Sequence, residues 1–297
     1  MSRFILKAYY VLTFPIAIYF ILSSTSIHRS YKLGFFRKLS LGTKMFLNKF
    51  RIPTGTSYKA HLAMALKILE TPPEMEGVIL ECGSWQGGSS ANLSLICKLT
   101  SRKLLIYDSF QGLPETQAED RQPYETGDFA GSLETVKRNI ELYGAIDCCE
   151  FVEGWFEDTL PQLDKPVLLA FIDVDLELSL ETCVRNIWPR LVKKGYIFID
   201  EYVELDYCSI FWSEKYWKKY FDRTPPGLIG SGVGLPLGEY YIGPWKENAD
   251  HPLHHPNAGA YTRKDFSGNW VHFPEPKSLV DRSTHDGHNK IIDKAAR

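Results

Sequence analysis

The chain has 297 residues, of which 44% are hydrophobic and 24% charged, and its formal net charge is −2. These values are ordinary for a globular protein, and the length suits one large domain with extensions or two small domains. The six cysteines lack C-x-x-C spacing and are too sparse for a secreted disulfide scaffold, so we expect reduced thiols.

The charges are distributed unevenly along the chain. Eleven Lys and Arg residues precede Glu70, the first acidic residue, so residues 1–69 carry +11. Because the net charge is −2, the remaining residues carry −13. The basic segment is expected to bind an anionic membrane surface. No nucleic-acid partner is expected, since no recognised nucleic-acid motif accompanies the basic residues.

A long apolar segment opens the sequence. Residues 4–22 read FILKAYYVLTFPIAIYFIL, and a helix of this length spans about 28 Å, near the thickness of a hydrocarbon core. We expect residues 1–28 to form a membrane-anchor helix and residues 29–56 a basic linker. The positive flank then favours a folded domain on the cytoplasmic face of a membrane. Two alternatives remain open: a helix packed on the following domain, or a cleaved signal peptide.

A helix at 57–70 with Ser57 as its cap leads into a glycine-rich segment. The run GVILECGSWQGGSSANLSLICKLTSRKLLIYD predicts a strand at 78–82, a helix at 88–99 and a strand at 103–107. Its glycines let the backbone approach a ligand, and the helix N-terminus offers N–H groups to an anion. Asp108, which ends the second strand, is suited to accept ribose hydroxyls. The segment therefore predicts a nucleotide-type pocket; the alternative is a turn that needs glycine only for packing.

The alternation of helices and strands continues beyond a polar loop at 111–131, a length typical of lids or binding loops. The predicted elements are a helix at 132–143, a strand at 148–152, a helical turn at 157–162, a strand at 167–172, a helix at 179–192, a strand at 196–199 and an aromatic-rich helix at 209–221. A late strand or hairpin is expected within residues 230–243.

This order of elements predicts an α/β fold: a doubly wound, Rossmann-like parallel sheet with helices on both faces, preceded by the N-terminal apolar helix. The domain is expected over residues 57–245. Residues 246–297 are rich in Pro, His and charged residues, which indicates an irregular C-terminal extension.

Acidic residues gather after the last two strands of this predicted sheet, at Asp173, Asp175, Asp200 and Glu201. The carboxyl ends of parallel strands share one edge, where ligands bind. Converging carboxylates raise one another's pKa, and a hard divalent cation such as Mg²⁺ or Ca²⁺ relieves that conflict. We expect a metal site here; the alternative is a set of separate solvated acids.

Five separated motifs carry a resemblance to a known family: ECGSWQGGSSA, DSFQGLP, EGWFEDTLP, FIDVDLELSLET and GYIFIDEY. Through them, residues 57–205 resemble the macrocin O-methyltransferase (TylF/MycF-like) family of class I S-adenosylmethionine-dependent methyltransferases. The better-known members methylate sugar hydroxyls of macrolide antibiotics with Mg²⁺. The resemblance implies an S-adenosylmethionine- and Mg²⁺-dependent O-methyltransferase acting on a hydroxyl of a sugar, a glycan or a glycosylated small molecule. Whether the chain forms a homo-oligomer stays open.

The resemblance also implies roles for individual residues. The implied cofactor-binding residues are Glu81, Gly83, Gly87, Ser89, Asp108, Trp155 and Phe156, with Asp108 at the ribose and the two aromatic residues at the adenine. The implied metal ligands are Asp173, Asp200 and Glu201; Asp173 and Asp200 are also the catalytic candidates, and Asp175 is an alternative ligand. The family often has two aspartates where this chain has Asp200-Glu201, so the metal geometry differs by one methylene.

Two other functions remain open. Asp173-Val174-Asp175 is a D-x-D sequence, which metal-dependent glycosyltransferases also use, but that hypothesis leaves DSFQGLP unexplained. A non-catalytic member that binds the cofactor is the second, because the altered acid pair permits it.

Overall fold

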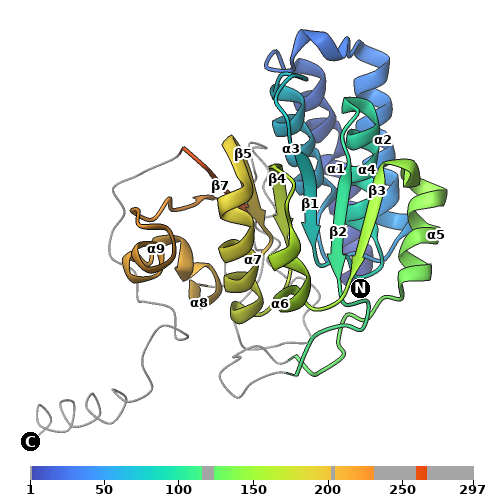
Figure 1. Ribbon diagram of the computed structural model, residues 1–297. Helices are drawn as coiled ribbons and strands as arrows, with labels where there is room; N and C mark the ends of the chain where they lie inside the picture. Colours follow the sequence, from blue (N-terminus) through green and yellow to red (C-terminus); the bar gives the residue numbers. More distant parts are fainter. Residues whose placement is uncertain (1, 116–123, 202–204, 231–258, 266–297) are drawn as a thin grey trace, which may run out of the picture.

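The computed structural model describes residues 2–115, 124–201, 205–230 and 259–265, and within them helices cover both faces of one seven-stranded sheet (Figure 1). The helices are α1 (Ser2–Ser23), α2 (Phe35–Arg51), α3 (Tyr58–Glu70), α4 (Gly88–Thr100), α5 (Leu133–Tyr143), α6 (Phe156–Thr159), α7 (Glu177–Arg190), α8 (Leu205–Cys208) and α9 (Glu214–Phe221). The strands are β1 (Val78–Cys82), β2 (Leu104–Asp108), β3 (Cys149–Glu153), β4 (Val167–Ile172), β5 (Leu191–Ile199), β6 (Ile229–Gly230) and β7 (Ala260–Arg263).

The strand order is β3-β2-β1-β4-β5-β7-β6, and β1 to β5 are parallel. The chain winds outward from β1 in one direction through β2 and β3, then crosses to β4 on the other side of β1. Ligands of open α/β sheets bind at such a reversal of strand order, at the carboxyl ends of the strands. The predicted Rossmann-like α/β sheet with helices on both faces is confirmed.

Two apolar cores flank the sheet, which explains the unbroken apolar runs of its central strands. All six residues of β4 are buried, as are four of the five in β1. Successive side chains alternate between the faces: Ile79 belongs to the core beneath α1–α5, and Leu80 to the core beneath α6–α9.

The N-terminal segment packs on the domain. Helix α1 contacts α2 and α3, and α2 contacts α3 and α4 (Figure 1). The linker expected at 29–56 is therefore wrong over Phe35–Arg51, because Leu41, Met45 and Asn48 form a buried helical face that the many basic residues obscure. No described helix has the length and hydropathy needed to cross a membrane.

A buried polar network holds α2, α3 and α4 together. Asn48 Nδ2 donates to Asn92 Oδ1 (2.9 Å), and Asn92 Nδ2 donates to His61 Nδ1 (2.9 Å). This assigns the His61 proton to Nε2, which lies 2.7 Å from Thr56 Oγ1. Burial, with Lys49 nearby, lowers the pKa of His61 to about 3, so its ring is neutral. The network ties the N-terminal helices to the helix that starts at the glycine-rich turn.

The C-terminal boundary differs from the prediction. Strand β7 lies at residues 260–263, inside the expected irregular extension, and pairs antiparallel with β5 and β6. The domain therefore does not end at 245, and the sheet is mixed. Four residues of alternating burial are too short a pattern to find in sequence. The hairpin expected at 230–243 and most of the expected 246–297 extension lie outside the described residues.

Candidate active site

The glycine-rich turn joins β1 to α4 in close contact with the end of β4. Gly83 has φ +83°, and a Cβ atom on it would stand 1.9 Å from the Asp173 carbonyl oxygen. Gly87, with φ +80°, begins α4 without a side-chain cap. The first N–H groups of α4 therefore have no side-chain acceptor at the cap position, and they are suited to donate hydrogen bonds to an anionic group such as a carboxylate.

Glu81 lies buried beneath this turn. Ser90 Oγ donates a 2.5 Å hydrogen bond to Glu81 Oε2. Burial raises the pKa of Glu81 to about 8, against the opposing effect of the Ser89 and Ser90 hydroxyls. The structure thus gathers three predicted cofactor residues, Glu81, Gly87 and Ser89, around one helix start.

Asp108 is fixed at the neighbouring strand end by hydrogen bonds to both carboxylate oxygens. Its Oδ2 accepts from Ser84 N (2.6 Å) and Ser84 Oγ (2.7 Å), and its Oδ1 accepts from Phe110 N (2.7 Å). A carboxylate has about four acceptor positions, so capacity remains for a ribose hydroxyl. Gly154 N donates to Asp108 O (3.0 Å), which brings Trp155 to the same sheet edge.

The acids after β4 and β5 converge only in part as predicted. One carboxylate oxygen from each of Asp173, Asp175 and Glu201 lies within 4.8 Å of the others. Asp200 is buried and lies outside this group. Of the predicted ligands Asp173, Asp200 and Glu201, the structure groups Asp173 and Glu201 with Asp175, the alternative ligand, whereas the ligand role of Asp200 stays a prediction. The backbone at Asp175, two residues after Asp173, is left-handed (φ +57°), and the chain turns there just after the end of β4.

These three acids have raised pKa values. Burial, before any charge effect, raises the pKa of Asp173 to about 6 and of Asp175 to about 7, and raises that of Glu201 well above its usual range. The proximity of Asp173 adds to the rise in the pKa of Glu201. Glu201 Oε2 and the Tyr207 hydroxyl are buried with no hydrogen-bond partner among the described residues. Clustered carboxylates, one of which has an oxygen that accepts no hydrogen bond from the described residues, are the kind of ligand that a hard divalent cation prefers.

An aromatic row joins the acids to the glycine-rich turn. The Trp85 ring meets Phe129 edge-on at 5.7 Å, and Phe129 meets Tyr124 at 5.3 Å. The Tyr124 hydroxyl is hydrogen-bonded to Asp175. Trp85, Tyr124 and Phe129 were not among the individually predicted site residues, although the 111–131 loop that carries Tyr124 and Phe129 was expected to be a lid or binding loop. The signal for Trp85 is its place inside the glycine-rich turn.

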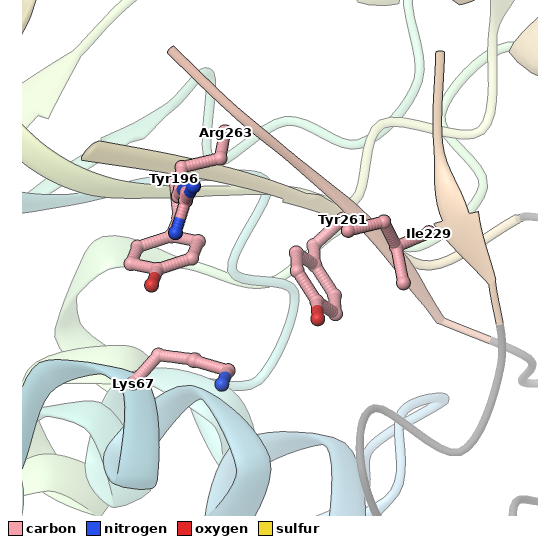
Figure 2. A pocket seen from close by; sticks show the side chains of 5 residues that line it. All are labelled: Lys67, Tyr196, Ile229, Tyr261 and Arg263. Carbon is pink, nitrogen blue, oxygen red and sulfur yellow. The ribbon is translucent and has the colours of Figure 1, made fainter. Parts of the chain in front are cut away.

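A separate pocket lies on the sheet face toward α3. Figure 2 shows its lining side chains, which are Lys67, Tyr196, Ile229, Tyr261 and Arg263. Tyr196 pairs with Leu169, well before the strand ends that carry the acids. The two positively charged side chains that line this pocket already form ion pairs: Lys67 with Glu70 (3.0 Å) and Arg263 with Asp265 (2.7 Å). We therefore place the functional site at the acids and the glycine-rich turn.

The profile of the macrocin O-methyltransferase (TylF) family matches residues 54–221, more than half of the chain. This chain belongs to that family. The matched residues include the glycine-rich turn, Asp108 and the acids after β4 and β5.

Individual relatives agree with this assignment. The chain is 35% identical over 144 residues to an 8-demethyl-8-(2,3-dimethoxy-alpha-L-rhamnosyl)-tetracenomycin-C 4'-O-methyltransferase of Streptomyces olivaceus (44% of this chain, 55% of the relative). It is 33% identical over 140 residues to a mycinamicin III 3''-O-methyltransferase of Micromonospora griseorubida (42% and 55%). The chain thus spans about half the length of these curated relatives.

Among solved structures, the O-methyltransferase NovP superposes with a TM-score of 0.51 at 20% identity, covering 86% of this chain and 98% of NovP. This likeness supports the methyltransferase fold.

Proposed function

We propose that the protein is an S-adenosylmethionine-dependent O-methyltransferase whose acceptor is a hydroxyl of a sugar or of a glycosylated small molecule, and that it uses Mg²⁺. Family membership and the relatives' named activities support the reaction. The observation that carries the proposal is the contact between Gly83 and Asp173, which puts a cofactor-type turn directly beside a metal-type acid group.

The residues around the turn fit the cofactor. The uncapped start of α4 suits the carboxylate of its methionine part, and Asp108 suits its ribose. Trp155 and Phe156 begin the segment after β3, beside Asp108, and offer flat apolar surface for the adenine. When bound, S-adenosylmethionine supplies a methyl group already activated by the sulfonium, so the protein's task is orientation.

The acid group fits Mg²⁺ through Asp173, Asp175 and Glu201. A bound divalent cation lowers the pKa of a coordinated substrate hydroxyl. Asp173 would hold such a cation at a fixed position relative to the glycine-rich turn, because Asp173 N donates to Cys82 O (3.0 Å) at the end of β1.

The aromatic row Trp85–Phe129–Tyr124 is suited to hold the acceptor. It lies between the glycine-rich turn and Asp175, where an acceptor must reach both methyl donor and cation. Aromatic faces pack well against the apolar faces of sugar rings and against flat aglycones. The glycosyltransferase alternative loses support, because its D-x-D sequence lies inside the segment matched by the methyltransferase family.

A transfer assay tests the proposal. Radiolabelled S-adenosylmethionine is offered with a panel of rhamnosides and other glycosides, with Mg²⁺ or with EDTA. We expect label in a glycoside only with Mg²⁺, and loss of transfer in Asp173→Asn but not in the exposed-acid control Glu141→Gln. Cofactor binding without transfer to any glycoside would favour a non-catalytic member. Transfer unaffected by EDTA would contradict the role of the metal.

A further inference from the structure

The outer side of the N-terminal helices is apolar. Eight of the twelve large hydrophobic residues that are exposed within the described ranges belong to α1 and α2: Val11, Leu12, Ile16, Tyr19, Phe35, Phe36, Leu47 and Phe50. Leu12 and Phe36 are the most exposed, at 76% and 81%. In α1, residues 12, 16 and 19 follow one helical stripe, opposite the side that packs on α2 and α3. Such clustering indicates a surface that meets another apolar phase or molecule.

The same region carries only positive charge. No acidic residue occurs before Glu70, and Arg29, Lys32, Arg37, Lys44 and Arg51 are exposed on or beside α2. Glu70 itself is engaged by Lys67 (3.0 Å) and by Ser26 Oγ (2.8 Å). We call the exposed apolar and basic residues of these two helices, which pack against each other, the α1–α2 face; residues 1–69 supply no acid to neutralise it.

We propose that the α1–α2 face docks this protein on the surface of an anionic lipid bilayer. Exposed aromatic and aliphatic side chains flanked by Lys and Arg are the composition of interfacial helices, whose apolar side enters the headgroup region while the cations meet anionic lipids. A second copy of this chain is a poorer occupant, because two faces of the same positive charge repel. Helix α1 does not have to cross the membrane to bury its apolar residues, since the side opposite the exposed stripe is already buried against the domain.

The docking face is connected to the glycine-rich turn. Lys49 of α2 lies over the Tyr10 ring of α1 (5.3 Å to its centroid) and donates to Thr54 O (3.0 Å). Thr54 in turn packs on Gly88, where an added Cβ would stand 2.7 Å from Thr54 Cβ. Docking therefore fixes the position of the proposed cofactor turn relative to the lipid. Because anionic lipids are enriched in the cytoplasmic leaflet, the proposal places the protein there.

Vesicle flotation of the full chain tests this. The probes are vesicles of phosphatidylcholine alone and of phosphatidylcholine mixed with phosphatidylglycerol, each at low and high salt. We expect binding to the mixed vesicles only, weakened by salt, since each basic residue near an anionic surface strengthens binding about fivefold. The Leu12→Glu/Phe36→Glu double variant should bind more than tenfold more weakly. Arg37→Gln/Lys44→Gln should lose affinity with a smaller salt dependence.

The matched control is Leu142→Glu/Leu178→Glu, which introduces the same two charges at residues of α5 and α7 that are 59% and 49% exposed. It should float like the wild type, and thermal unfolding verifies that all variants fold. Equal binding to neutral vesicles, binding that survives both double substitutions, or dimerisation of the chain in place of flotation would overturn the proposal. Protein that resists extraction by salt and alkaline carbonate would also overturn it, in favour of insertion.

Discussion

The backbone of Gly83 lies directly against that of Asp173: a Cβ atom on residue 83 would stand 1.9 Å from the Asp173 carbonyl oxygen. This contact joins the turn after β1 to the acids after β4. A single glycine thus sets the distance between the proposed cofactor and metal positions.

Gly83→Ala should damage both stability and cofactor affinity. The added Cβ meets a backbone atom that cannot move away cheaply, and φ +83° is strained for any residue with a side chain. We expect the free energy of unfolding to fall by about 2 kcal/mol or more, and S-adenosylhomocysteine affinity to fall more than tenfold. Urea unfolding and calorimetry measure these quantities. Gly55→Ala, with no atom within 4 Å of its Cβ, is the control; wild-type affinity in Gly83→Ala would refute the role of this contact.

The identity of the third metal ligand is testable with Mn²⁺ in place of Mg²⁺. Asp175→Asn removes a carboxylate from the group of three, whereas Asp200→Asn removes one that lies outside it. We expect Asp175→Asn to weaken Mn²⁺ binding at least tenfold, and Asp200→Asn to weaken it less. Electron paramagnetic resonance titration measures free Mn²⁺ directly. The reverse ranking would restore Asp200 as the ligand.

Glu81→Gln should stabilise the protein at alkaline pH. The folded-state pKa of Glu81 is raised from 4.5 to about 8, so its contribution to stability is full below pH 4.5 and is lost as the pH rises toward 8. The loss over that window is on the order of 4 kcal/mol. Glutamine stays neutral and avoids it.

Urea unfolding at pH 5 and pH 8 measures this effect. We expect Glu81→Gln to gain stability relative to the wild type between the two pH values, and Glu141→Gln, at an exposed site, to show no such gain. A pH-independent difference between Glu81→Gln and the wild type would mean that Glu81 is ionised in the folded protein.

His61 should make the folded state sensitive to acid. Its folded-state pKa is lowered from 6.5 to about 3, so its contribution is full above pH 6.5 and is lost as the pH falls toward 3. Between pH 6.5 and 5 the wild type should lose about 2 kcal/mol of unfolding free energy through this residue. His61→Gln should be less stable at pH 7.5 but lose less on acidification. Parallel pH profiles of the two proteins would contradict a neutral, buried His61.

The sequence predicted the central sheet because its strands are buried on both faces. Such strands read as continuous apolar runs, and β1, β2 and β4 are of this kind. Helix α2 was missed because its buried face includes the polar Asn48, whose partners Asn92 and Tyr143 lie 44 and 95 residues away. No local pattern reports such distant hydrogen bonds.

The composition of the acid group was predicted in part for a similar reason. That acids follow β4 and β5 is visible in the sequence, and parallel strands bring their ends together. Which carboxylates converge depends on the left-handed turn at Asp175, a conformation that the residue type permits but does not dictate. The row from Trp85 to Tyr124 likewise depends on how a long loop folds back over the glycine-rich turn, where Gln86 Nε2 donates to Ala130 O at 3.2 Å.

Calorimetric titration of the full chain with S-adenosylmethionine and S-adenosylhomocysteine, for the wild type and Asp108→Ala, tests the cofactor pocket most directly. Asp147→Ala, at an exposed acid beside β3, is the matched control. We predict micromolar binding by the wild type and the control, and a loss of at least tenfold in Asp108→Ala. A well-folded wild type that binds neither ligand, or an Asp108→Ala variant that binds both normally, would contradict the account.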